Sequence, residues 1–246
     1  MSALFRLDGK VALVTGGSRG LGRQMALAFA EAGADVIVVS RKQDACEVVA
    51  AAIRDLGRRA LALACHMGEW PQIDALVERV YGDWGRIDVL VNNAGLSPVE
   101  PSSAATSEAL FDKVMDVNFK GPFRLAALVG GHMVAGDGGT VINVSSLGAL
   151  NPQPGIIPYA GAKAALNAMT VGLAREFAPK VRVNTLSPGM FATDISHHWQ
   201  NTEAMQAGIP LKRFGQPVEI IGSALYLASD ASSYTTGANI AVGGGI

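Results

Sequence analysis

Short apolar runs alternate strictly with longer segments of helical character along this chain, and few folds accommodate such a pattern. The apolar runs lie at residues 10–15, 35–40, 59–65, 87–92, 139–145, 181–185 and 239–242. The segments between them predict helices at 20–33, 42–57, 70–83, 107–134, 158–177 and 217–228. Consecutive strands joined by helices pair in parallel, because right-handed crossovers are the common connection. We therefore expect an α/β fold, a doubly wound parallel sheet of seven strands with helices on both faces.

No linker, internal repeat or low-complexity block interrupts this series. Hydrophobic residues make up 49% of the chain and charged residues 17%, which is typical of globular proteins. A chain of 246 residues can bury a sizeable core. We therefore expect residues 1–246 to form a single domain.

Charge and hydropathy exclude several classes of partner. The net charge of −1 gives no electrostatic case for binding nucleic acid or an anionic membrane. No apolar run reaches the ~18–20 residues that span a bilayer, and the N-terminus shows no signal-peptide core. Cys46 and Cys65 provide neither a disulfide framework nor a metal-ligand pair. The expectation is a cytoplasmic protein with reduced thiols and no bound metal.

A glycine-rich segment, residues 15–22, falls at the first predicted strand-to-helix turn. Glycines allow the backbone to approach a pyrophosphate closely, and the helix N-terminus that follows supplies oriented N–H groups. A tight turn without a ligand is the alternative, but a position after the first strand of a βαβ unit favours dinucleotide binding. The candidate contacts are Gly16, Ser18, Arg19, Gly20, Leu21 and Gly22.

The end of the second predicted strand indicates which dinucleotide would bind. NAD-binding folds usually carry an acid there, which hydrogen-bonds the ribose 2′-hydroxyl. Here the strand ends in Ser40, and Arg41 and Lys42 follow it. Together with Arg19 of the glycine-rich turn, these cations could bind a 2′-phosphate, and no carboxylate is present to repel one. We therefore predict NADP(H) as the cofactor; the alternative is that Arg41 and Lys42 form an ordinary solvated helix start.

Tyr159 and Lys163 are four residues apart within a predicted helix, so their side chains share one face. A phenol beside an ammonium group can donate or accept a proton near neutral pH. Such a pair is common by chance, so its weight depends on its neighbours. Two serines, Ser145 and Ser146, end the preceding predicted strand and would face opposite sides of it.

Taken together, these motifs resemble those of the short-chain dehydrogenase/reductase family over essentially the whole chain. The matching residues are Thr15-Gly-x-x-x-Gly-x-Gly22, Asn92-Asn-Ala-Gly95, Asn118, Ser146, Tyr159-x-x-x-Lys163, and Ser187-Pro-Gly189 with Thr193. The chain looks most like NADPH-dependent carbonyl reductases and 3-oxoacyl carrier-protein reductases. The resemblance implies a dinucleotide-binding Rossmann fold and hydride transfer between NADP(H) and a carbonyl or secondary alcohol.

The resemblance also implies a role for each catalytic residue. Tyr159 would protonate the carbonyl oxygen as hydride arrives, and would act as the base in the reverse direction. Lys163 would hold the nicotinamide ribose and lower the pKa of the tyrosine. Ser146, preferred to Ser145 on its spacing from the tyrosine, would donate a hydrogen bond to the substrate oxygen. Asn118 would position a water that links the lysine to solvent.

Further cofactor contacts follow from the resemblance. They are Asn93, Ala94 and Gly95 after the fourth strand, and Pro188, Gly189 and Thr193, which resemble the segment that contacts the nicotinamide carboxamide. His66, followed by Met67, stands where the family often has an aspartate that contacts the adenine. The usual Asp-Gly-Gly near the C-terminus reads Val242-Gly-Gly-Gly245, so a carboxylate that often supports that end is absent.

The segments that would bind the substrate carry fewer recognisable motifs than those that would bind the cofactor. Residues 190–212 form a partly apolar segment, with His197, His198 and Trp199, that could fold over the substrate as a lid. Between Ser146 and Tyr159, the apolar side chains of Leu147, Leu150, Ile156 and Ile157 favour an apolar carbonyl or alcohol substrate. By resemblance, the long helices near 107–134 and 158–177 form a dimer interface, and a second interface would give a homotetramer.

Three other functions remain open at this point. One is a 3-oxoacyl-thioester reductase of fatty acid or polyketide synthesis, for which Lys212 and Arg213 would face an acidic carrier protein. Another is an NAD(P)+-dependent alcohol or polyol dehydrogenase. The third is a non-enzymatic dinucleotide-sensing protein. Loss of Tyr159 or Lys163 would favour it, but both are present. A methyltransferase is disfavoured, because no acid ends the second strand.

Overall fold

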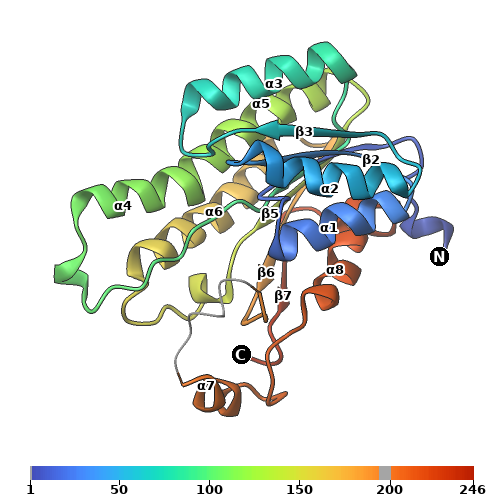
Figure 1. The fold of residues 1–246 in the computed structure, drawn as a ribbon. Helices are drawn as coiled ribbons and strands as arrows, with labels where there is room; N and C mark the ends of the chain where they lie inside the picture. The colour runs from blue at the N-terminus through green and yellow to red at the C-terminus, as the bar shows by residue number, and fades with distance from the viewer. Residues whose placement is uncertain (1, 194–200) are drawn as a thin grey trace.

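The computed structural model describes residues 2–193 and 201–246 and contains a seven-stranded parallel sheet in the order β3-β2-β1-β4-β5-β6-β7 (Figure 1). The strands are β1 (Val11–Thr15), β2 (Asp35–Ser40), β3 (Ala60–Ala64), β4 (Val89–Asn92), β5 (Gly139–Val144), β6 (Val181–Pro188) and β7 (Asn239–Val242). The helices are α1 (Gly20–Glu31), α2 (Gln43–Asp55), α3 (Trp70–Trp84), α4 (Glu108–Met115), α5 (Gly121–Ala135), α6 (Ile157–Glu176), α7 (Thr202–Gly208) and α8 (Ile221–Ala228). The expected doubly wound α/β fold is confirmed.

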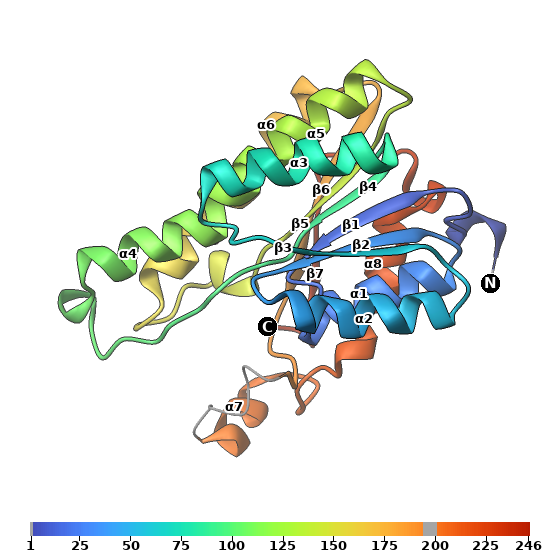
Figure 2. The same ribbon diagram turned by 45° about the horizontal axis from the view of Figure 1, so that its top comes forward.

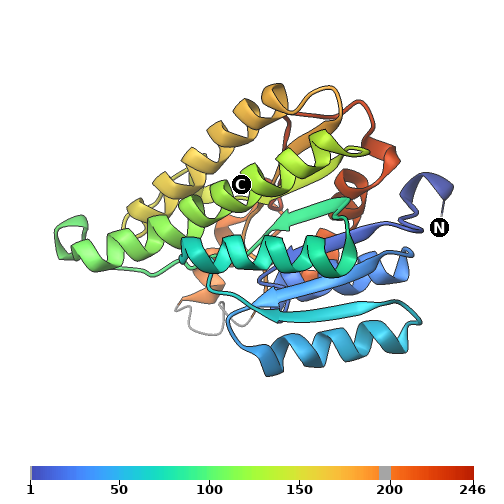
Figure 3. The same ribbon diagram turned by 90° about the horizontal axis from the view of Figure 1, so that it is seen from above.

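Helices cover both faces of the sheet, and each face has its own apolar core. α1, α2 and α8 pack on one face and α3, α5 and α6 on the other (Figure 2). Seen from above, α3, α5 and α6 lie beside one another across the sheet (Figure 3). Successive residues of β1 point to opposite cores, Ala12 and Val14 to one and Leu13 to the other, as strand geometry requires. Burial on both faces explains why the strands are continuous apolar runs.

The strand order reverses direction between β1 and β4. β2 and β3 follow β1 to one side, whereas β5, β6 and β7 follow β4 to the other. β1 and β4 are paired, with Val14 opposite Val91. The connections that leave the two strands therefore diverge, and open α/β sheets bind ligands at such a point.

The helix expected over 107–134 differs from the prediction. It is divided into α4, a π-helical turn at Asp116–Lys120 and α5. Within this turn the side-chain amide of Asn118 donates to the Val114 carbonyl oxygen at 2.9 Å. Gly121 follows, and a Cβ there would lie 1.7 Å from the Met67 carbonyl oxygen. A wider turn and a glycine let this helix approach the loop after β3.

Two smaller differences concern the second half of the chain. β6 continues to Pro188, three residues beyond the predicted strand end. The helix expected at 217–228 begins as a 3-10 turn at Pro217–Ile220 before α8. Within the described ranges, no helix is long and apolar enough to cross a membrane.

Candidate active site

The glycine-rich turn connects β1 to α1 and is packed too tightly for other residues. Gly16 and Gly20 have φ angles of +63° and +53°, a region that side chains rarely adopt. A Cβ on Gly22 would lie 2.3 Å from the Gly16 carbonyl oxygen. The N-cap residue of α1, Arg19, makes no side-chain capping hydrogen bond within the described ranges, and a helix N-terminus of this kind can bind an anion.

The buried hydroxyl of Thr15 joins this turn to the end of β4. It accepts hydrogen bonds from the backbone N–H groups of Asn93, at 2.9 Å, and Ala94, at 3.1 Å, and donates to the Val91 carbonyl oxygen at 3.1 Å. The Asn93 amide in turn donates to the Thr15 carbonyl oxygen at 2.8 Å. This segment therefore braces the glycine-rich turn. The bracing role of Thr15 was not predicted, although a threonine that ends a buried strand beside a glycine-rich turn is a usable signal.

We expect Thr15→Val to destabilise the protein by about 1–3 kcal/mol, because it preserves shape but removes three hydrogen bonds to the backbone. The Asn93 N–H and the Val91 carbonyl oxygen keep each other as partners at 3.1 Å, so the Ala94 N–H is the group most affected. Thr15→Ser retains the hydroxyl and should lose less than about 1 kcal/mol. Urea unfolding of the three proteins measures both values. Equal stability of the valine and serine variants would contradict the bracing role.

A cavity of about 290 Å³ opens between the glycine-rich turn and the segment after β6. Its lining consists of Ser18, Arg19, Gly20, Arg23, Gln24, Ala192, Thr193 and Pro217. Four of these residues, Ser18, Arg19, Gly20 and Thr193, are predicted cofactor contacts. Arg23, Gln24, Ala192 and Pro217 were not predicted, since their place in the cavity depends on α1 and the 3-10 turn at Pro217–Ile220 meeting the segment after β6.

The end of β2 presents the cations that the sequence analysis singled out. The Ser40 hydroxyl lies 3.0 Å from the Cys46 sulfur. Arg41 and Lys42 are exposed, and their side chains form no hydrogen bond or ion pair with any residue in 2–193 or 201–246. Asp44 lies in the first turn of α2, but no carboxylate ends β2 itself. This edge could receive an additional phosphate without first breaking an ion pair.

His66 and Met67, after β3, occupy different environments. The Nδ1 atom of His66 accepts a hydrogen bond from the Gly68 N–H at 3.1 Å, which leaves Nε2 as a donor. Met67 is buried in the core beneath α3 and α5. Only the main chain of Met67 could therefore meet a ligand, whereas the partly exposed His66 ring could meet an adenine.

Ser146 and Tyr159 meet beyond the carboxyl end of β5. The Ser146 hydroxyl accepts from the Gly148 N–H at 3.0 Å, which orients it, and both it and the Tyr159 ring lie against Gly148. Burial raises the pKa of Tyr159, and the weaker effect of the Ser146 hydrogen bond lowers that pKa. Ser145 points elsewhere, since its buried hydroxyl donates to the Lys163 carbonyl oxygen at 3.2 Å. The two serines therefore face different partners, and Ser146 is the one beside the tyrosine.

Lys163 is almost wholly buried, with its Nζ atom 5.9 Å from the centre of the Tyr159 ring. Nζ donates to the Val144 carbonyl oxygen at 2.7 Å. Burial lowers the pKa of Lys163 to about 8. In this arrangement the influence that lowers the pKa of Tyr159 is the hydroxyl of Ser146, so the expected lowering by Lys163 stays a prediction.

Asn118 is the fourth residue of the predicted catalytic set. Its amide donates to the Leu96 carbonyl oxygen and accepts from the Leu96 N–H, at 2.9 and 3.2 Å. Its side chain therefore holds the segment after β4 against the π-helical turn. Gly95 permits this contact, because a Cβ there would lie 2.8 Å from the Asn118 amide oxygen and 3.6 Å from the Lys163 Nζ.

The segment after β6 lies between the two halves of the site. The Gly189 N–H donates to the Val242 carbonyl oxygen at 2.9 Å. A Cβ on Gly189 would lie 2.8 Å from the Gly243 Cα and 3.2 Å from a Leu147 methyl group, so Pro188-Gly189 passes close to the residue after Ser146. Thr193 reaches the glycine-rich turn. Ile195, His197, His198 and Trp199 of the predicted lid lie outside the described residues.

No three His, Cys, Asp or Glu side chains gather as a metal site in the part of the chain that the structure describes. What the geometry does assemble is a glycine-rich turn at a helix N-terminus, a basic strand end and a Ser-Tyr-Lys group along one edge of a parallel sheet. Proton transfer beside a bound dinucleotide is the chemistry that this set can perform.

Comparisons with known proteins agree with this interpretation. The profile of the short chain dehydrogenase family matches residues 10–204. Human dehydrogenase/reductase SDR family member 4 is 37% identical over 244 residues, which are 97% of this chain and 88% of that protein. The NAD-dependent glycerol dehydrogenase of Listeria innocua is 37% identical over 245 residues, 98% of this chain and 95% of that protein.

A solved structure gives the same result in three dimensions. The gluconate 5-dehydrogenase of Burkholderia cenocepacia, crystallised in complex with NADP and tartrate, superimposes with a TM-score of 0.93 at 33% identity. The superposition covers 98% of this chain and 96% of that chain. The chain therefore belongs to the short-chain dehydrogenase/reductase family, which consists of nicotinamide-dependent oxidoreductases of alcohol and carbonyl groups.

Proposed function

We propose that this enzyme transfers a hydride between NADP(H) and a carbonyl or secondary alcohol, with Tyr159 as the general acid and base. The observation that carries the proposal is that the Ser146 hydroxyl lies beside Tyr159, with Lys163 Nζ 5.9 Å from the centre of the tyrosine ring. The group lies at the same sheet edge as an anion-binding turn. Bound NADPH would supply the hydride. The protein must then supply the proton and hold the oxygen that receives it.

Each residue of the group has a distinct task in the proposed reduction. Tyr159 donates its phenolic proton to the carbonyl oxygen, and burial keeps that proton in place at neutral pH by raising its pKa. Ser146, oriented by the Gly148 N–H, donates a hydrogen bond where negative charge develops. Lys163 stands behind the tyrosine at the position expected to bind the ribose hydroxyls. The hydrogen bonds between the Asn118 side chain and the Leu96 backbone fix the segment after β4, which faces Lys163.

The end of β2 supports NADP(H) rather than NAD(H). The solved relative contains NADP, whereas the glycerol dehydrogenase is described as NAD-dependent, so family membership does not decide the question. Ser40, Arg41 and Lys42 leave this edge basic, without a carboxylate at the strand end. Charge-assisted hydrogen bonds to a 2′-phosphate contribute ~1.5–3 kcal/mol each.

We expect Arg41→Ala to lower the preference for NADPH over NADH by about 10–100-fold, chiefly through the KM for NADPH. The measurement is the ratio of kcat/KM for the two cofactors. Arg175→Ala, which removes an exposed charge from the far end of α6, serves as the control. An unchanged ratio in Arg41→Ala would remove Arg41 from the 2′-phosphate site.

An apolar substrate is the second part of the proposal. Leu150, in the loop between Ser146 and Tyr159, is 60% exposed, and Val99 packs near the same loop at Gly155 and is 71% exposed. Leu147, by contrast, is buried against Gly243. Ile157 is two residues from Tyr159 on α6 and therefore points to another side of the helix. We propose that 190–212, which contains α7, closes over this region as a lid.

The carrier-protein alternative loses support from the surface near the site. Arg213 is paired with Glu219 at 2.6 Å, and the Lys212 ammonium donates to the Ala207 carbonyl oxygen at 2.7 Å. Both cations are therefore engaged within the protein.

The test of the proposed function is a screen of NADPH and NADH consumption over ketones, aldehydes and acetoacetyl thioesters at fixed pH. Activity with none of these, in either direction, would contradict it.

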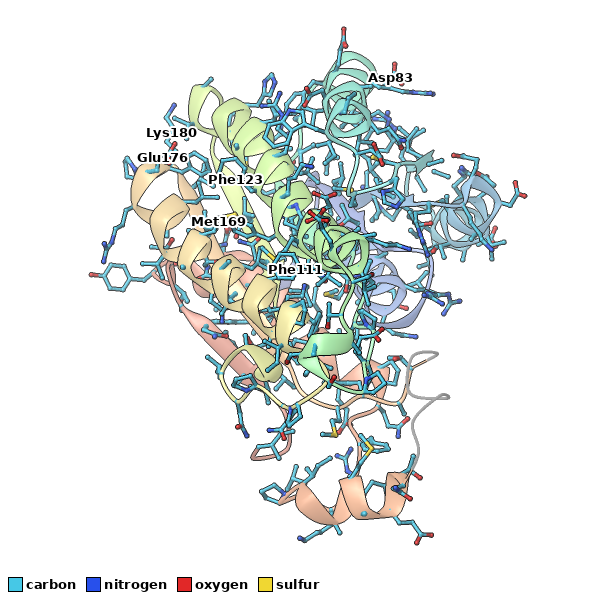
Figure 4. The ribbon with its side chains drawn as sticks, turned by 90° about the vertical axis from the view of Figure 1, so that its left-hand side faces the viewer. Asp83, Phe111, Phe123, Met169, Glu176 and Lys180 are labelled. Carbon is cyan, nitrogen blue, oxygen red and sulfur yellow. The ribbon has the colours of Figure 1, made fainter. Side chains whose placement is uncertain are left out.

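A second copy of this chain is the proposed partner. Phe111, Phe123 and Met169 lie along the outer surface formed by α4, α5 and α6 (Figure 4). Phe111 and Phe123 are 47% and 40% exposed, and such apolar side chains on neighbouring helices indicate a protein contact. We propose a homodimer through this face, and a homotetramer if a second face is used.

A further inference from the structure

A buried hydroxyl, that of Thr170, ties the catalytic helix α6 to the sheet. It accepts a hydrogen bond from the Asn143 amide and another from the Thr185 hydroxyl, both at 2.9 Å, and donates to the Leu166 carbonyl oxygen at 3.0 Å. Thr170, Asn143 and Thr185 are each at most 1% exposed. Three hydrogen bonds therefore converge on one atom between the helix and the strands β5 and β6.

The strand residues that reach this hydroxyl form one row across the sheet. Asn92 of β4 is in register with Asn143 of β5, which is in register with Thr185 of β6. The Asn92 amide donates to the Asn143 amide oxygen at 2.9 Å and so extends the chain of hydrogen bonds to a third strand. Nearer the catalytic pair, Ser145 and the Val144 carbonyl oxygen bond to Lys163. α6 is thus fixed to the sheet at two levels.

The apolar packing of α6 determines its rotation only weakly. Its buried residues are Ala160, Ala162, Lys163, Leu166, Thr170, Leu173 and Ala174, of which only the two leucines are large apolar side chains. Hydrophobic burial is non-directional, and small side chains interlock poorly with the strands beneath them. Hydrogen bonds are directional, so they can fix a helix where apolar contacts leave it free to turn or slide.

Stability alone does not account for the polar row. Among the described residues, the Asn92 amide oxygen has no hydrogen-bond partner although it is buried. A partly satisfied polar network is less stable than a well-packed apolar layer. The same space filled with valine and leucine would hold the sheet and helix together without this cost. What the polar row adds, compared with an apolar layer, is directional hydrogen bonding.

We propose that Thr170 is a positioning residue of the reaction: its hydroxyl, held by Asn143 and Thr185, sets the rotation and depth of α6 and thereby the placement of Tyr159 and Lys163. The proposal rests on the role assigned above to Tyr159. Thr170 lies seven residues beyond Lys163, roughly two helical turns on the same buried side. A misplacement of about 1 Å at the reacting atoms can cost about 100-fold in rate.

The test compares Thr170→Val with Thr170→Ser and with Thr140→Val. Thr140 lies on the same strand as Asn143, is buried, and donates its hydroxyl to the Leu227 carbonyl oxygen at 3.2 Å on the opposite face of the sheet. The control therefore loses a buried hydroxyl without touching α6. Rates are measured well below the melting temperature of each protein, with NADPH affinity followed by fluorescence.

We expect Thr170→Val to lower kcat at least about 10-fold, with the KM for the carbonyl and the Kd for NADPH within about threefold of wild type. Thr170→Ser should restore kcat, and Thr140→Val should retain it. Thr185→Val, which removes one donor and leaves the Asn143 bond, serves if the first variant does not fold, and should show a smaller decrease in kcat.

Other outcomes separate the two proposals. A wild-type protein that reduces no carbonyl, or a Tyr159→Phe variant with full activity, would contradict the proposed function and not the geometry of α6. An active wild type, with Thr170→Val or its substitute Thr185→Val no slower than Thr140→Val, would overturn the positioning role. Equal loss of kcat in the serine and valine variants of Thr170 would overturn it as well, since serine keeps the hydroxyl.

Discussion

Tyr159→Phe is expected to reduce the rate of carbonyl reduction by about 10²–10⁴-fold while NADPH still binds, because the change removes the proton donor and leaves the ring in place. The glycine-rich turn and the basic end of β2 do not contact this hydroxyl in the structure. Ser146, which accepts a hydrogen bond from the Gly148 N–H, would remain to hydrogen-bond the substrate oxygen. It would not supply the proton in place of Tyr159. The measurement is kcat under saturating NADPH, with the NADPH Kd determined separately.

Tyr81→Phe provides a matched control for this substitution. Burial raises the pKa of Tyr81 to about 12, so it is also a buried phenol that keeps its proton. Its ring stacks on His132 between α3 and α5, away from the site, with centroids 3.9 Å apart. We expect this variant to retain kcat. Near-wild-type turnover in Tyr159→Phe would refute the assignment of the acid and leave the cofactor site unaffected.

The fold could be predicted from the sequence because the patterns that mark each strand and helix are local and repeated along the chain. Most strands carry a short apolar run, and even β7, only four residues long, has the bounds that the sequence predicted. Chain order then brings the carboxyl ends of β1, β4, β5 and β6 to one edge of the sheet. The residues at these ends, such as Gly16 and Ser146, therefore lie along the same edge of the sheet.

The features that sequence could not supply depend on contacts between distant segments. Met67 follows His66 directly, yet one is core and the other partly exposed, because Gly121 brings the π-helical turn against the loop. Similarly, nothing near Thr170 in the chain indicates that Asn143 and Thr185 meet its hydroxyl. Register between parallel strands joined by long crossovers determines that contact, and periodicity within one strand does not reveal it.

Lys163 should make the stability of the protein rise with pH between about 8 and 10.5. Burial lowers its pKa from 10.5 to about 8, so in that range the unfolded chain binds a proton that the folded protein has released. Unfolding stability therefore increases with pH, because the unfolded state binds more protons. The full effect is about 3 kcal/mol, and it is absent below pH 8, where both states carry the charge.

Tyr159 acts in the opposite direction and must be removed from the comparison. Its raised pKa makes the folded protein retain a proton above pH 10, which lowers stability as pH increases. We therefore compare Tyr159→Phe with Tyr159→Phe/Lys163→Met by urea unfolding at pH 7.5 and 10. The protein with lysine should gain about 2–3 kcal/mol relative to the methionine variant over this interval. The Val144 carbonyl oxygen loses its partner at both pH values, so that loss cancels. Parallel pH profiles would show that Lys163 keeps its ordinary pKa in the fold.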